Sequence, residues 1–180
     1  MSQPLGYNAG DDAVDLGIHV RTLPSAEPIV MWVPDIRSVI VQADLDPTRH
    51  NEAVAHGVAH AVLENSWLVR RARLGRVPRI TVELAVHDLV ARRLIPVADL
   101  QEGVSRFDSI QRCATWLGVS VSILTHRLLK LKATERRLIQ PGLLDRLSWA
   151  GAETISGGIT CVWVEAQPAP ILPRLPRRRV

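Results

Sequence analysis

The sequence is poor in Phe, Tyr and Cys, and it contains no long hydrophobic run. One Phe and one Tyr stand beside five Trp in 180 residues, so Leu, Val, Ile and Ala must fill the core. Cys113 and Cys161 lie far apart without CxxC or Cys/His spacing, which argues against a disulfide framework or a thiolate zinc site and is typical of a reducing compartment. With no secretory signal in residues 1–15 and no apolar run of roughly 18 residues, we expect a cytoplasmic protein without membrane contact.

The basic excess lies at one end of the chain. The net charge is +4, but the 18 acidic residues and 18 of the 22 basic residues precede Pro168. A neutral body with a basic end argues against a dedicated nucleic-acid domain. The excess consists of Arg174, Arg177, Arg178 and Arg179.

Length and patterning predict a single α+β domain with extensions. We expect residues 1–13 to be disordered because they are polar and contain glycine. The domain itself should span 14–147. A hairpin with a two-glycine turn is expected within 148–167, and a Pro/Arg-rich, disordered tail over 168–180.

The first half of the domain favours a small sheet followed by a helix. Residues 15–23 alternate apolar and polar side chains, which is typical of a half-buried strand. Residues 29–33 and 38–43 should form a hairpin across a proline-containing turn. Asp46-Pro47 then predicts a capped helix over 47–64.

Further helices should follow an arginine-rich surface loop over 66–79. We expect one over 81–94, ending before Pro96, and another from a capping box of Asp108 and Gln111 to Gly118. The next should be capped by Ser120 or Ser122. A helical stretch over 134–147, broken by Pro141, should close the domain.

His56 and His60 are the chemical focus of the sequence. Four residues apart on a helix, both imidazoles lie on one face and can bind one zinc ion, leaving positions for a third ligand and a water. In the HExxH arrangement, the glutamate after the first histidine is the general base. Here Gly57 holds that position. A bare HxxxH spacing is also common among unrelated surface histidines.

Three segments in order strengthen the metal interpretation. They read RHNEAVAHGVAH, VELAVHDLVARRLIP and IQRCATWLGVSVSILTHRLLKL. With the strand, hairpin and helix order they resemble the ImmA/IrrE family of zinc-dependent peptidases, in its short actinobacterial and actinophage form, over residues 15–147. The resemblance implies a zincin-like fold with a small antiparallel sheet on the metal-site helix, then a helical bundle.

Carried over by position, the resemblance implies zinc ligands at His56, His60 and Glu83, the last from the second helix. His87 stands where relatives tend to place an acid, and it is expected to orient a ligand, to be a spare ligand, or simply to be a partly buried histidine. Gly57 and His87 both depart from the family pattern. Loss of a general base typically removes about 10² to 10⁴ in rate.

Glu52 and Glu64 are the alternative bases on the same helix. Each lies one turn outside a histidine, about 5.4 Å along the axis. Both are therefore expected to point away from the site.

Two features leave nucleic-acid binding open. Five arginines over 70–79 can contact phosphate or an acidic partner, although a solvated loop is the favoured interpretation. Residues 108–131 resemble a helix-turn-helix, yet the second helix offers mainly core side chains. The arginines are Arg70, Arg71, Arg73, Arg76 and Arg79.

The favoured hypothesis is a catalytically impaired ImmA/IrrE-like protein that acts by binding a protein partner such as a repressor or an antitoxin, in toxin-antitoxin or phage-host regulation. The alternatives are an active zinc peptidase with a non-standard base, and a DNA-binding regulator.

Overall fold

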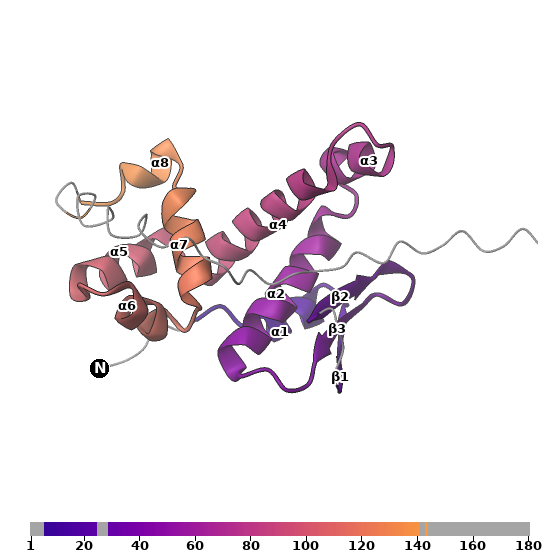
Figure 1. Ribbon diagram of the computed structural model, residues 1–180, viewed down its shortest axis with the longest axis horizontal. Helices are drawn as coiled ribbons and strands as arrows, with labels where there is room; N and C mark the ends of the chain where they lie inside the picture. The colour runs from indigo at the N-terminus through magenta and orange to yellow at the C-terminus, as the bar shows by residue number, and fades with distance from the viewer. Residues whose placement is uncertain (1–5, 25–28, 141–142, 144–180) are drawn as a thin grey trace, which may run out of the picture.

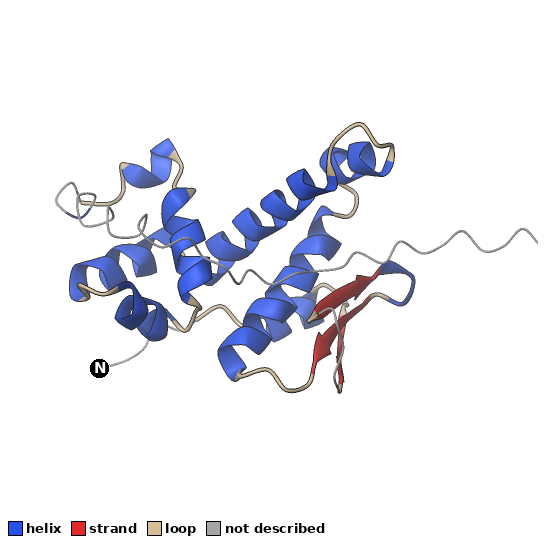
Figure 2. Cartoon of the chain, in the orientation of Figure 1, coloured by secondary structure: helices blue, strands red, loops and turns tan. Residues whose placement is uncertain are grey.

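The computed structural model describes residues 6–24, 29–140 and 143, and within them the chain has an α+β architecture (Figures 1 and 2). A small sheet is covered by two helices, a long helix crosses them, and shorter helices gather at the other end of that long helix. The hairpin expected within 148–167 and the tail over 168–180 lie outside the described residues. In the described part, no helix combines the length and apolar character needed to cross a bilayer.

The sheet has three strands in the order β1-β3-β2, with β1 His19–Leu23, β2 Val30–Val33 and β3 Ser38–Gln42. The hairpin of β2 and β3 is confirmed, and the short 3-10 helix η1 Pro34–Ile36 makes its turn. β1 pairs with β3 in parallel, so the prediction of a fully antiparallel sheet is wrong. Alternation identifies a strand, but it fixes neither its neighbour nor its direction.

The expected half-buried strand over 15–23 is also corrected. The strand begins only at His19, and all five of its side chains are exposed, because the helix Pro47–Leu63 packs mainly on the other two strands.

Residues 1–13, expected to be disordered, contain part of a helix. The helix α1 Ala9–Asp15 is capped by Asn8 and buries Ala9 and Ala13 completely. The side chain of Asn51 accepts a hydrogen bond from the Ala9 N–H and donates one to the Tyr7 carbonyl, which fixes this segment on the next helix. The buried face of α1 consists of two alanines four residues apart, and the polar composition of the segment gave no indication of this helix.

The helix α2 Pro47–Leu63 begins as predicted. The Asp46 carboxylate accepts a hydrogen bond from the Arg49 N–H at 3.0 Å, and Pro47 occupies the first turn. Every residue from 52 to 60 is buried, because α2 packs on β2 and β3, on α1 and on the long helix α4 Arg79–Leu94. It is the central helix of the fold (Figure 1).

The predicted surface loop over 66–79 contains a helix instead. In α3 Trp67–Arg73, the Ser66 hydroxyl accepts a hydrogen bond from the Val69 N–H, and the Val69 side chain is buried. Gly75 then turns the chain at a left-handed φ of 66° into α4. Of the arginines that indicated a loop, Arg70, Arg71 and Arg73 are exposed on this helix, and the other two follow it.

Four helices complete the described chain. They are α5 Val97–Arg106, α6 Ile110–Leu117, α7 Val121–Leu129 and α8 Ala133–Arg136. The predicted capping box at Asp108 is wrong, since α6 starts after Ser109, whose hydroxyl bonds the Gln111 side chain. Gly118 ends α6 at φ 68°, and Ser120 caps α7, both as predicted. Of the stretch expected to be helical over 134–147, the part before Pro141 contains the short helix α8, while residues 141–142 and 144–147 lie outside the described part of the chain.

A buried arginine joins the C-terminal helices. Arg127 of α7 donates to the Ile95 carbonyl and, through both terminal nitrogens, to the Glu135 carboxylate of α8. Hydrogen bonding from Arg127 lowers the pKa of Glu135 to about 2, outweighing its partial burial. Cys113 is a buried free thiol whose pKa burial raises to about 11, and Cys161 lies outside the described residues.

Candidate metal centre

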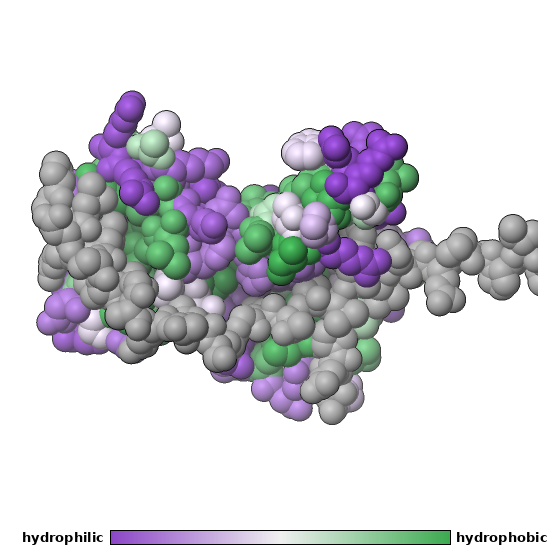
Figure 3. All heavy atoms as spheres, turned by 45° about the horizontal axis from the view of Figure 1, so that its top comes forward, coloured by the Kyte–Doolittle hydropathy of each residue, from purple (hydrophilic) through white to green (hydrophobic). Residues whose placement is uncertain are grey.

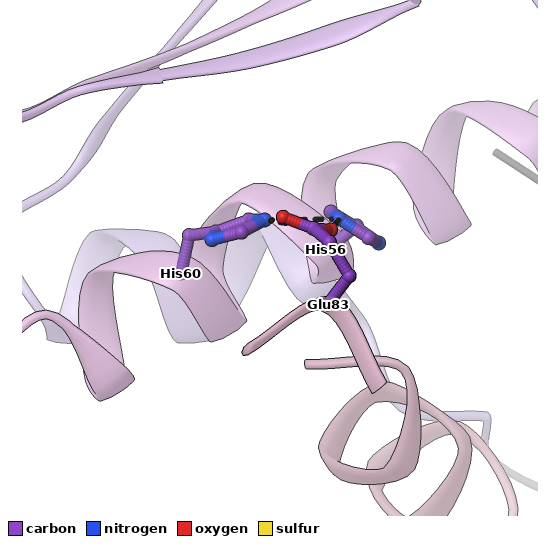
Figure 4. Close-up of side chains that lie close together, drawn as sticks. All are labelled: His56, His60 and Glu83. Atoms are coloured by element: carbon purple, nitrogen blue, oxygen red, sulfur yellow. Dashed lines mark hydrogen bonds and ion pairs between the residues drawn. The ribbon is translucent and has the colours of Figure 1, made fainter. Parts of the chain in front are cut away.

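The two histidines of α2 face the crossing helix α4. His56 and His60 are each only 1% exposed, and they lie one turn apart on the side of α2 that α4 covers. Glu83 projects from α4 toward both rings and is 25% exposed, so it marks the open side of the group (Figure 4).

The donor atoms of these three side chains converge. The Nε2 atoms of His56 and His60 are 3.1 Å apart, and the Oε2 atom of Glu83 lies 3.4 Å from the first and 3.5 Å from the second. Among the described residues, these three form the group of potential ligands whose donor atoms all lie within 4.8 Å of one another. The arrangement can hold a metal ion.

The spacing fits a small divalent ion. A point equidistant from three atoms with these separations lies about 1.9 Å from each, close to the roughly 2.0–2.1 Å of zinc–imidazole and zinc–carboxylate bonds. A slight displacement from the plane of the three atoms brings the distances into that range. Two imidazoles and a carboxylate are also a donor set used by catalytic zinc sites, which keep a fourth position for water.

The protonation states favour metal binding as well. Burial lowers the pKa of His56, which keeps its imidazole neutral and available as a ligand. Burial acts to raise the pKa of Glu83, but hydrogen bonding from His56 and His60 outweighs it and lowers that pKa to about 2. At neutral pH the site therefore offers a neutral imidazole at His56 and a carboxylate.

Gly57 is the contact point between α2 and the sheet. A Cβ atom at this position would lie 2.4 Å from Cγ1 and 2.7 Å from Cγ2 of Val39, a fully buried residue of the central strand β3. Real side chains do not approach so closely, so a glutamate here requires the strand or the helix to shift. The position at which HExxH proteins carry the general base is thus one that has no room for a side chain in this fold.

The two alternative bases on α2 are both occupied elsewhere. The buried Glu52 carboxylate accepts a hydrogen bond from the Ser120 N–H at the start of α7, and burial raises its pKa. Glu64 forms an ion pair of 3.6 Å with Arg73 of α3. Their partners agree with the expectation that both carboxylates point away from the histidines.

His87 lies behind His56, and a further histidine continues the row. The His87 ring contacts the His56 ring edge-on at 5.0 Å between centroids, and His126 of α7 lies 5.9 Å beyond it. Burial and the neighbouring His56 lower the pKa of His87 to about 4. His87 is not in the group of converging ligands, so the geometry favours a supporting position over that of a spare ligand.

His126 was not predicted from the sequence. It follows His87 by 39 positions on another helix, so no local spacing connects them, and only the packing of α7 on α4 brings the rings together. Burial also lowers its pKa. Its Nε2 atom is buried without a hydrogen-bond partner among the described residues.

The arginines and the helix-turn-helix-like segment contribute none of the three converging ligands. All five arginines over 70–79 are exposed at or beyond α3. In α7, the side chains of Ile123, Leu124 and Leu128 are buried, so this helix contributes to the core, as its composition indicated.

Comparison of the chain with models of known protein families and with curated proteins finds no match.

Proposed function

We propose that this chain is an ImmA/IrrE-like metal-binding protein with a zincin-like fold, in which peptide hydrolysis is impaired and which acts by binding a protein partner such as a repressor or an antitoxin. The observation that carries the proposal is the convergence of His56, His60 and Glu83 beside a residue, Gly57, that has no room for a base. The order and spacing of the three resembling segments support the family assignment.

The three ligands define what the site can do. His56, His60 and Glu83 would hold a zinc ion, which supplies a Lewis acid when bound. His87 packs against the His56 ring and supports its orientation. The residue directly after His56 is Gly57, which has no side chain to accept a proton. Loss of the general base typically lowers the rate by a factor of about 10² to 10⁴. The site is therefore better suited to holding a partner than to cleaving it.

Metal content of the purified protein tests the binding half of this proposal. Untagged wild type supplied with zinc should retain about one ion per chain after dialysis, because three ligands converge. Glu83→Ala and His60→Ala should lose it, whereas the matched variant Glu102→Ala, which removes an exposed carboxylate of α5, should bind like wild type. Equal zinc content in wild type and Glu83→Ala would refute the metal centre.

Cleavage of a mixed fluorogenic peptide library tests the impairment. Zinc-loaded wild type should show no metal-dependent hydrolysis. Restoring the base requires Val39→Ala together with Gly57→Glu, because the added side chain meets Val39, and this double variant should gain activity. Metal-dependent hydrolysis by wild type that His56→Ala abolishes would favour the active-peptidase alternative.

The DNA-binding alternative has less support. The helix that would enter a groove is largely buried, and the exposed arginines are not on it. Binding of duplex DNA that weakens steeply with salt, and that is weaker and less salt-dependent in Arg70→Ala, would favour it.

A further inference from the structure

The end of the molecule formed by α3, its turn and the first turns of α4 presents an unusual surface, called here the α3 tip. Residues 67–82 contain five arginines and no acidic residue. Between these arginines, large apolar side chains are exposed: Trp67 at 65%, Leu74 at 67% and Ile80 at 63%. Figure 3 shows hydrophilic and hydrophobic side chains side by side at this end.

The α3 tip is a preformed surface. Ser66 caps α3, Val69 anchors it to the body, and the Arg76 N–H donates to the Arg71 carbonyl to close the turn. A rigid surface loses little conformational entropy when it binds. Arg73 is partly neutralised by Glu64, but with no acidic residue of its own the tip stays positive.

The tip continues toward the metal centre along α4. Ile80 precedes Glu83 and Leu84 by three and four residues, and His87 follows them by four and three, so these side chains share one face of the helix. Leu84 is 48% exposed and Glu83 is the open side of the ligand group. A chain lying on the α3 tip is thereby directed to the candidate metal centre.

We infer that the α3 tip binds an acidic peptide segment with apolar anchor residues. Carboxylates of such a segment complement the arginines, and its apolar side chains cover Trp67, Leu74 and Ile80, which otherwise remain in water. A nucleic acid satisfies the guanidinium groups but leaves Leu74 and Ile80 uncovered. A bilayer requires a continuous apolar helix face, whereas these side chains are spread over a seven-residue helix, a turn and a second helix.

This inference rests on the proposed function in one respect: both assume that the partner is a protein. Peptide binding at the tip does not require the metal ligands. Metal-free Glu83→Ala should therefore still bind the peptide, so failure of the metal centre and failure of the tip give different results.

Fluorescence anisotropy with labelled peptides tests the tip. The probes are an amphipathic peptide of Leu with Asp and Glu, the same peptide with Ser in place of Leu, and a version with Lys in place of the acids. The chain should bind the first, and bind it less tightly as salt increases. The other two should bind at least about tenfold more weakly, because one lacks the apolar side chains and the other lacks the negative charges.

The chain offers matched control variants. Arg70→Glu with Arg71→Glu should weaken binding of the acidic peptide about tenfold, whereas Arg136→Glu with Arg137→Glu makes the same charge change on another exposed pair and should have little effect. Leu74→Ala should weaken it, and Leu138→Ala, at the same 67% exposure, should not.

Three results would overturn the inference: equal loss in tip and control variants, no preference for the acidic apolar peptide, or binding confined to phosphatidylserine vesicles or to duplex DNA.

Discussion

At the scale of single residues, Gly57 matters for what cannot be attached to it. Gly57 lies between the two candidate ligands His56 and His60, and a side chain added to it would collide with Val39 of the central strand. Glycine costs a helix interior about 1 kcal/mol relative to alanine, so the local sequence gains nothing from it. The absence of a side chain lets α2 approach β3 closely. This packing buries the whole middle of the helix, which compensates for the low helix propensity of glycine.

A double-mutant cycle tests this contact. Gly57→Ala should destabilise the protein, because an overpacking cost of about 1–3 kcal/mol exceeds the helix-propensity gain of about 1 kcal/mol. In combination with Val39→Ala the added methyl finds space, so the pair should be less destabilised than the sum by about 1–2 kcal/mol. Urea unfolding measures this coupling.

Val41→Ala provides the control, since Val41 is equally buried on the same strand, while the three atoms nearest to the added one all belong to Val39. Equal coupling for both valines would contradict a specific contact between Gly57 and Val39.

Residue spacing predicted part of the site. The four-residue interval of His56 and His60 agrees with the geometry because it depends on local helical order. Glu83 lies on another helix, and only the resemblance placed it with them. The reason for Gly57 and the presence of His126 were out of reach. Each depends on an element distant in the sequence, β3 in one case and α7 in the other.

At the scale of elements, capping residues predicted where helices begin and end better than local composition predicted whether a segment is helical. Asp46, Gly118 and Ser120 act where the sequence placed them. The segment of α3 was taken for a loop because arginines, glycine and proline dominate it, although Val69 is buried and Leu68 and Ala72 pack against the core. The parallel pairing of β1 depends on tertiary packing and has no local signature.

The junction of α7 and α8 allows a prediction of its own. Glu135→Ala leaves the buried guanidinium of Arg127 with the Ile95 carbonyl and without its carboxylate, so the free energy of unfolding should fall by about 3–5 kcal/mol. Glu102→Ala breaks an exposed pair on α5 and should cost less than about 1 kcal/mol. Similar losses in both variants, measured by urea unfolding, would contradict the buried network.

At the scale of the whole molecule, the row of buried histidines makes stability depend on pH. His56, His87 and His126 have pKa values lowered by burial, with that of His87 at about 4. Between pH 6.5 and about 4 these histidines therefore bind more protons in the unfolded chain than in the folded one. The contribution of Glu83, whose pKa falls from 4.5 to about 2, is lost only at lower pH.

The metal-free protein should accordingly lose stability as the pH falls from 6.5 toward 4. Urea unfolding in EDTA measures this slope, which His87→Gln should reduce. The exposed His19 of β1 supplies the control variant His19→Gln. Saturating zinc should raise stability at neutral pH by about 2.7 kcal/mol at a hundred times the dissociation constant, and lose that effect on acidification. A flat profile in EDTA would contradict the buried, neutral histidines.

The hydrogen bond from the Ser120 amide to Glu52 links two parts of the molecule that are 68 positions apart in the chain. Glu52 precedes His56 by one turn of the same helix. Any rotation of α2 that re-aims the imidazole must also move this carboxylate, and with it the first turn of α7. The hydrogen bond thus fixes the histidine-bearing helix against the start of α7.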